Sequence, residues 1–197
     1  MNKPTVHINR EPLLNMLLAA AETYNRECLG YVFGSGPTRK RRFFRITNVI
    51  AIQGVRRRTN VEIEQSQRSW KRLHGYIKSS LRLYPILGDF HSHPASGPYK
   101  KSIEMSETDI MGMRKDSDAK IGIIIGISSR TKKRVLWNVP VRGPHTGILR
   151  GSLAGFTFKV CAYTLATNGN AELVPKRLRI VAPAALKALN RVNAQSA

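Results

Sequence analysis

The sequence GDFHSHPASGPYKKSIEMSETDI, residues 88–110, decides how the rest of this chain is interpreted. It places His91 and His93 two residues apart and follows them with a Ser-x-x-Asp step at Ser106 and Asp109. Two imidazoles and one carboxylate form a three-ligand zinc set, which leaves a fourth coordination position open for water. Because an open position distinguishes a hydrolytic zinc from a structural one, these residues favour an enzyme over a scaffold.

The spacing of these residues predicts how they meet. Residues 83–90 are mostly apolar and predict a strand, in which every second side chain points to the same face. His91 and His93 then share one face, as two ligands of one metal must. Ser106 is the expected N-cap of a helix, so Asp109 lies in the first helical turn, close enough to fold back onto the histidines.

A second carboxylate of interest is Glu27, which begins the segment ECLGYVF and joins an expected helix to an expected strand. A carboxylate at the mouth of a strand can face a cleft, and a zinc hydrolase needs a general base for its water. Taken alone, a glutamate in such a turn is more often a surface residue. Paired histidines on a strand also occur by chance, so neither signal is specific by itself.

Together these segments resemble one family. Glu-x-x-Gly at residues 27–30, His-Ser-His-Pro at 91–94 and Ser-x-x-Asp at 106–109 look like the JAMM (MPN-plus) zinc metalloproteases, over about residues 5–140. Members include the deubiquitinating subunit of the proteasome lid, the AMSH endosomal deubiquitinases, and archaeal and bacterial relatives that act on ubiquitin-like proteins. The resemblance implies a cytidine-deaminase-like α/β fold and cleavage after the terminal Gly-Gly of a ubiquitin-like protein.

The resemblance also assigns roles to individual side chains. It implies that His91, His93 and Asp109 bind Zn²⁺. It implies that Glu27 is the general acid and base and that Ser106 helps to hold the oxyanion. A second hypothesis keeps the zinc chemistry but trims a sulfur-carrier protein or a phage tail protein. A third is a non-catalytic JAMM-like subunit that binds RNA or an assembly partner, against which the complete ligand set argues.

One departure from the family pattern concerns the loop after the histidines, expected over residues 95–101. The usual gap of about seven residues would select Ser102, but the residue three positions further on is Met105, which cannot supply the carboxylate. We prefer Asp109 because the ligand set needs a hard oxygen donor. Glu104 or Glu107 is the alternative ligand.

Length and composition point to one domain with an appended segment. The chain has 197 residues, of which 42% are hydrophobic, enough for a real core. We expect a JAMM metalloprotease domain over 1–145 and a C-terminal extension over 146–197, packed on the same domain. The pattern predicts an α/β fold with a mixed central sheet flanked by helices. Strands are expected over 5–8, 27–33, 42–52, 83–90, 120–128 and 134–139, helices over 9–25, 65–83 and 106–114, then strands within 152–165 and 171–182 and a helix over 183–193.

The charge of the chain is strongly positive. The formal net charge is +21, and basic residues gather at 39–45, 54–58 and 68–72. Such a charge favours an acidic protein partner or nucleic acid, and the interleaving of Arg and Phe in RRFFR occurs in nucleic-acid binders. Solvated strand faces, or a generally basic proteome, would give the same runs.

The apolar runs of the sequence predict the cellular compartment of the protein and the state of its two cysteines. None reaches the length of a membrane span, and the leucines of residues 13–21 fall on one helical face, so we expect a cytoplasmic protein with a core helix there rather than a signal peptide. Cys28 and Cys161 lie in apolar runs and are expected to be inert, buried thiols. The oligomeric state does not follow from the sequence.

The remaining polar residues near strands are weaker candidates. His7, His74 and His145 are expected to be structural or solvated. Asp89 would share a strand face with His91, and we consider it a partner that orients that imidazole.

Overall fold

The computed structural model describes residues 4–59, 63–80, 85–95, 103–116, 119–129, 134–143 and 145–195. The helices are α1 (Arg10–Glu22), α2 (Gln67–Ser80), α3 (Glu107–Lys115) and α4 (Pro183–Gln195). The strands are β1 (Thr5–Ile8), β2 (Leu29–Ser35), β3 (Phe43–Ala51), β4 (Val55–Arg58), β5 (Ile63–Gln65), β6 (Ile86–Pro94), β7 (Ile121–Ser129), β8 (Leu149–Leu153), β9 (Phe156–Thr167) and β10 (Leu173–Val181).

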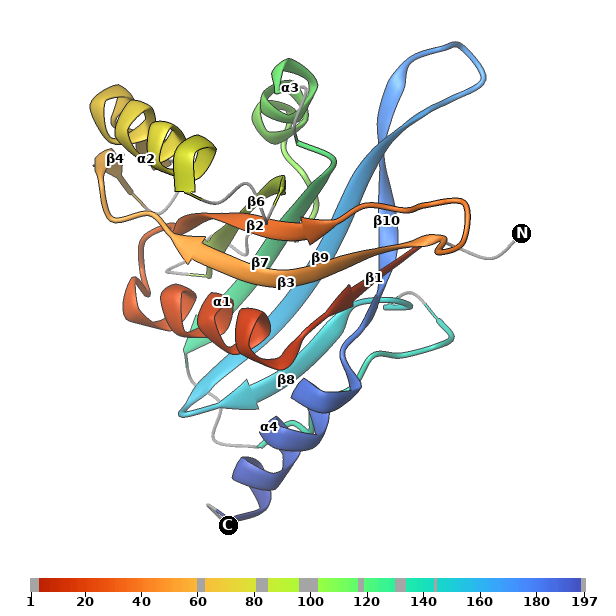
Figure 1. Ribbon diagram of the computed structural model, residues 1–197. Helices are drawn as coiled ribbons and strands as arrows, with labels where there is room; N and C mark the ends of the chain where they lie inside the picture. Colours follow the sequence, from red (N-terminus) through yellow and green to blue (C-terminus); the bar gives the residue numbers. More distant parts are fainter. Residues whose placement is uncertain are drawn as a thin grey trace.

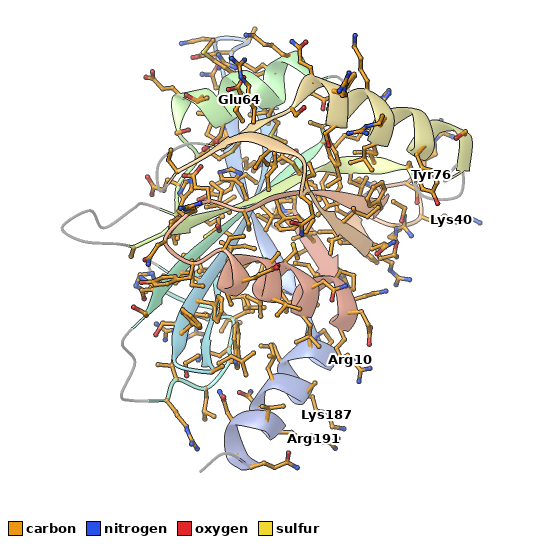
Figure 2. All side chains as sticks on the ribbon, turned by 90° about the vertical axis from the view of Figure 1, so that its left-hand side faces the viewer. Arg10, Lys40, Glu64, Tyr76, Lys187 and Arg191 are labelled. Atoms are coloured by element: carbon orange, nitrogen blue, oxygen red, sulfur yellow. The ribbon has the colours of Figure 1, made fainter. Side chains whose placement is uncertain are left out.

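A mixed sheet forms the centre of the molecule, as the sequence predicted. Its strand order is β10-β1-β3-β2-β6-β7-β9-β8, and a further pairing of β10 with β9 closes seven of these strands into a circuit, with β8 paired to β9 outside it. β1 runs parallel to both β3 and β10, and β6 runs parallel to β7. Helices α1 and α4 lie below the sheet and α2 and α3 above it in the views of Figures 1 and 2. The predicted α/β class with helices on the sheet is therefore confirmed.

The lower side of the sheet holds the main core. Leu13, Met16 and Leu17 of α1 are at most 1% exposed and recur at the i, i+3 and i+4 spacing of one helical face. They belong to the same apolar cluster as Ile123 and Ile125 of β7. Full burial of each such side chain stabilises the fold by about 1.5–3 kcal/mol. This packing fixes β7 and, through it, the neighbouring strand β6.

A smaller apolar cluster occupies the upper side of the sheet. It contains Ile124 of β7 and Tyr163 of β9, with Ile103 and Met105 from the segment before α3 packed against it. Gly126 of β7 makes room for this segment, because a Cβ at that position would lie 2.6 Å from Ile103 Cγ2. The upper cluster therefore holds the approach to α3 on the sheet.

Most expected elements occur, but one expected strand does not. Residues 134–139 form no strand; Asn138 makes an isolated bridge to Arg150. The backbone amides of this segment find side chains instead of a ladder, since Val135 N donates to Ser152 Oγ and Trp137 N to Asn190 Oδ1. The β4–β5 hairpin was not predicted; its strands are short, and β4 is mostly arginine.

Some predictions fall outside the described residues. These are the end of the helix predicted to residue 83, the loop over residues 96–101 with Lys100 and Lys101, and Ser102. Within the described residues, no helix combines the length and apolar composition that crossing a bilayer requires.

Candidate metal centre

Strand β6 sorts its side chains between the two sides of the sheet. Phe90 and Ser92 are fully buried and alternate with Asp89, His91 and His93. Since side chains alternate along a strand, these last three residues share the opposite face. β6 pairs with β2 on one edge and with β7 on the other, so this orientation is fixed from both sides.

The third candidate ligand comes from the start of α3. Ser106 is the N-cap, and its hydroxyl accepts a bond from Asp109 N while Ser106 N donates to Asp109 Oδ2 at 2.8 Å. This reciprocal pair is a capping box, with Asp in place of the usual Glu. The box holds Oδ2 against the helix start and leaves Oδ1 facing His91 at 3.4 Å from Nε2.

The three groups converge to the geometry that zinc needs. Nε2 of His91 lies 3.1 Å from Nε2 of His93, and one ligand atom from each of the three residues lies within 4.8 Å of the others. Zinc bonds to nitrogen and oxygen are about 2.0–2.2 Å, so adjacent ligands on a tetrahedral ion are about 3.3–3.6 Å apart. Nε2 of His91 lies 3.1 Å from Nε2 of His93 and 3.4 Å from Oδ1 of Asp109, and both distances are close to this ligand–ligand separation. The donor set and its spacing therefore fit zinc.

Charge is balanced within the centre by the acidic residues around His91. Burial by itself lowers the pKa of His91, but the Asp109 and Asp89 carboxylates outweigh burial and raise that pKa to about 10. Burial also disfavours the charged form of Asp109, yet the bonds from His91 and Ser106 hold the Asp109 pKa well below its usual range. The two carboxylates thus favour the protonated form of His91 when no metal is bound.

Glu27 lies beside this centre through the β2–β6 register. Leu29 pairs with His91, and Ser92 N donates to the Cys28 carbonyl at 3.1 Å while Cys28 N donates to Ser92 Oγ at 2.8 Å. Continuing the antiparallel register from Leu29 by two residues places Glu27 opposite His93, and residues opposite one another share a sheet face. Glu27 is 5% exposed, so it is a buried carboxylate and not a surface residue.

Ser92 has a role that the sequence did not reveal, and Ser106 makes a contact other than the predicted one. Ser92, the middle residue of the His-Ser-His motif, faces the core and locks Cys28, the residue after Glu27. Its signal was present, because a serine at an inward position of an apolar strand needs a hydrogen-bond partner. The Ser106 hydroxyl donates to Asp109 Oδ2 at 2.8 Å, so its role toward an oxyanion stays a prediction.

The remaining candidates lie elsewhere or play supporting parts. Asp89 Oδ1 is 3.8 Å from Nδ1 of His91, on the side of the ring away from Asp109. Glu104 is paired with Arg177 at 3.7 Å, and Glu107 is exposed. The other histidines are outside the group: His7 stacks on Phe43, His74 stacks on Trp70, and His145 is exposed.

Comparison with known proteins places the chain in a family. Residues 10–139 match the family of prokaryotic homologs of the JAB domain, and the chain belongs to this family. The JAMM/MPN resemblance predicted from the sequence is thereby confirmed. The solution structure of protein DSY2949 from Desulfitobacterium hafniense matches 90% of this chain and 92% of its own, with 14% identity and a TM-score of 0.46. No curated protein matches the sequence.

The ligand assignment predicts the outcome of single substitutions. Wild type should take up about one zinc per chain, and His91→Ala or Asp109→Ala should lose most of it. Glu107→Ala is the matched carboxylate control and should keep it. Metal content after dialysis, with circular dichroism to verify folding, checks this. Zinc lost from Glu104→Ala and retained by Asp109→Ala would show that the ligand is the other carboxylate.

The raised pKa of His91 predicts proton release. A ligand imidazole must be neutral, so zinc binding at pH 6 should displace at least about one proton, and zinc affinity should rise with pH up to the His91 pKa. At pH 6 a zinc-bound water, with its pKa of about 7, contributes little to the count. Titration calorimetry in buffers of different ionisation enthalpy measures the number of protons released for each zinc bound. A binding enthalpy that is the same in all buffers would contradict the protonated centre.

Proposed function

We propose that this chain is a zinc-dependent peptidase of the JAMM type that cleaves after the C-terminal Gly-Gly of a ubiquitin-like protein. The observation that carries the proposal is the convergence of His91, His93 and Asp109 beside the buried carboxylate of Glu27. A structural zinc site would normally present four protein ligands, whereas the described residues supply three. The free position then serves a water molecule.

The residues of the chain supply the proton transfers. Zinc, when bound, contributes Lewis acidity that lowers the pKa of water to about 7. Glu27 accepts a proton from the attacking water, whose oxygen adds to the scissile carbonyl carbon. Glu27 then returns this proton to the leaving amine as the carbon–nitrogen bond breaks. The Ser106 hydroxyl turns from Asp109 toward the developing oxyanion.

A cleft on the histidine side of the sheet suits an extended peptide. It lies between α2 and α3, has a volume of about 340 Å³, and is lined by Tyr31 of β2, Trp70 and His74 of α2, and Gly112 of α3 among others. Tyr31 is the register partner of Asp89, and Gly112 lies one helical turn after Asp109. A tail that occupies this cleft leads to the metal centre, where the absence of side chains on Gly-Gly lets its carbonyl approach closely.

Other substrates and roles follow from the same site. Trimming of a sulfur-carrier protein or of a phage tail protein uses the same residues and differs in the partner presented to them. In a non-catalytic subunit that binds RNA or an assembly partner, the metal centre would catalyse no reaction. Incubation with ubiquitin-like fusions and with tail-protein fusions, each with and without a chelator, separates these three.

The proposed base predicts a specific kinetic loss. Glu27→Gln should keep zinc content and folding but lose about 10²–10⁴-fold in hydrolysis, because the amide cannot take the proton. Glu22→Gln, at the exposed end of α1, is the matched control and should be as active as wild type. Cleavage of a Gly-Gly fusion is the assay. Activity of Glu27→Gln within tenfold of wild type would place the base at another residue.

The positive charge suggests an acidic substrate, and one basic cleft lies close to α2. It is lined by Arg56, Arg68, Lys71 and Arg72, with one carboxylate, Glu64, held 3.5 Å from Arg56. α2 borders this basic cleft on one side and the proposed substrate cleft on the other. An acidic partner would therefore be attracted toward the side of the molecule that carries the metal centre.

The steering proposal predicts an effect of position as well as of charge. Arg68→Glu/Lys71→Glu should lower the apparent second-order rate of cleavage by about tenfold at low salt, and less as salt rises. Lys187→Glu/Arg191→Glu removes the same charge from α4, far from α2 in Figure 2, and should change the rate little. Equal losses in both variants would mean that net charge, not this cleft, steers the substrate. Loss of RNA retention with unchanged cleavage would assign the cleft to nucleic acid.

A further inference from the structure

The segment that leads into α3 is held by strands from the end of the chain. Tyr163 of β9 is 4% exposed, and its hydroxyl donates to the carbonyl oxygen of Ile103 at 3.0 Å. Ile103 precedes the N-cap Ser106 by three residues and Asp109 by six. β9 begins at Phe156, beyond the part of the chain that matches the JAB-domain family. The contact therefore links the metal centre to residues that the family match does not include.

The hydroxyl of Tyr163 keeps its proton and can therefore donate this hydrogen bond at every working pH. Burial raises the pKa of Tyr163 to about 12, so the phenol keeps its proton over the whole range in which the protein would work. The ring contacts the guanidinium of Arg177 on β10, 5.8 Å from the ring centroid, and Arg177 also reaches Glu104 at 3.7 Å. Two adjacent residues of the approach segment, Ile103 and Glu104, are thus bound to β9 and β10.

Packing presses the same segment onto β7. Ile103 lies against Gly126, and the methyl group of Met105 lies 3.5 Å from the position that a Cβ on Gly122 would take. Met113 of α3 reaches the same glycine from the helix and is 6% exposed. Side chains before and within α3 therefore share one surface of β7. The Tyr163 hydrogen bond fixes the approach segment on that surface.

The far end of α3 is tied to the same pair of strands. The Arg114 guanidinium donates to the backbone carbonyl of Leu173, the first residue of β10, and to Glu172 Oε1. The segment before α3 is thus attached to β9 and β10, and the last turn of α3 is attached to the start of β10. Asp109 lies between the two attachments, and its Oδ1 faces His91 at 3.4 Å.

We propose that Tyr163 is a positioning residue of the metal centre, which sets the place of Asp109 by binding the Ile103 carbonyl, and that β9 and β10 therefore form part of the site. This rests on the proposed role of Asp109 as a metal ligand. His91 and His93 are fixed by β6, whereas Asp109 comes from a separate helix whose distance from them depends on this attachment. Zinc can reach three ligands at once when that distance is held.

The test is to remove the hydroxyl and measure metal binding directly. Tyr163→Phe keeps the ring and loses the hydrogen bond, which leaves the Ile103 carbonyl without this donor. Loss of a group that positions a metal ligand typically costs about 10- to 100-fold in metal affinity, so zinc affinity should fall by roughly that factor. The d–d absorption spectrum of the Co²⁺-substituted protein should change as well, because the position of the carboxylate changes.

A neighbouring hydroxyl provides the matched control. Thr164 follows Tyr163 on β9, and its Oγ1 donates to the backbone carbonyl of Lys120 at 2.9 Å, away from α3. Thr164→Val removes a hydrogen bond of the same kind and should lower the melting temperature without altering zinc affinity or the Co²⁺ spectrum. Arg114→Met changes an exposed side chain, and it should weaken zinc binding in the same direction.

Each outcome decides between the two proposals. If wild type binds zinc, and Tyr163→Phe and Arg114→Met bind it equally well with an unchanged Co²⁺ spectrum, the positioning role is wrong and the metal centre stands. Loss of affinity in Thr164→Val to the same extent would reduce Tyr163 to a general contribution to stability. A wild-type chain that binds no zinc would overturn both proposals, since positioning a ligand has no meaning without the metal.

Discussion

The orientation of β6 is the constraint on which the candidate centre depends. β6 pairs with β2 on one edge and β7 on the other, so a slip of one residue would turn His91 and His93 into the core and bring Phe90 and Ser92 to the opposite face. Burial of Phe90 opposes such a slip, and so does the Ser92–Cys28 hydrogen bond, which would be lost within the sheet. The apolar core thus determines where two polar ligands point.

The three carboxylates around His91 come from different parts of the fold and have different proposed roles. Asp89 follows the strand face, Asp109 arrives on a helix, and Glu27 arrives at the end of a neighbouring strand. Asp109 and Asp89 lie near opposite nitrogens of the His91 ring, which favours one orientation of that ring. Glu27 lies across from His93 and is not part of the three-residue metal group. This separation agrees with the proton-transfer role proposed for Glu27, which is distinct from that of a metal ligand.

The sequence predicted much of this centre because its signals are local. Alternation on β6 and the Ser106 cap are properties of short segments, so the convergence of His91, His93 and Asp109 followed from spacing. The support from Tyr163 is separated from Ile103 by 60 residues, and no short-range pattern connects them. The strand predicted over residues 134–139 failed for a related reason. Its alternation was real, but distant side chains on β8 and α4 took its backbone amides.

The closed strand circuit has a consequence for the order of events during synthesis. β1 pairs in parallel with β10, with Thr5 opposite Arg179, so this part of the sheet cannot form until β10 has been synthesised. Pairings between such distant segments carry a high loop-closure entropy and slow folding. All the residues proposed for catalysis are translated by residue 109, whereas β9 and β10 follow only from residue 156 onward. The nascent chain therefore carries the residues of the candidate centre well before it has the strands that hold them together.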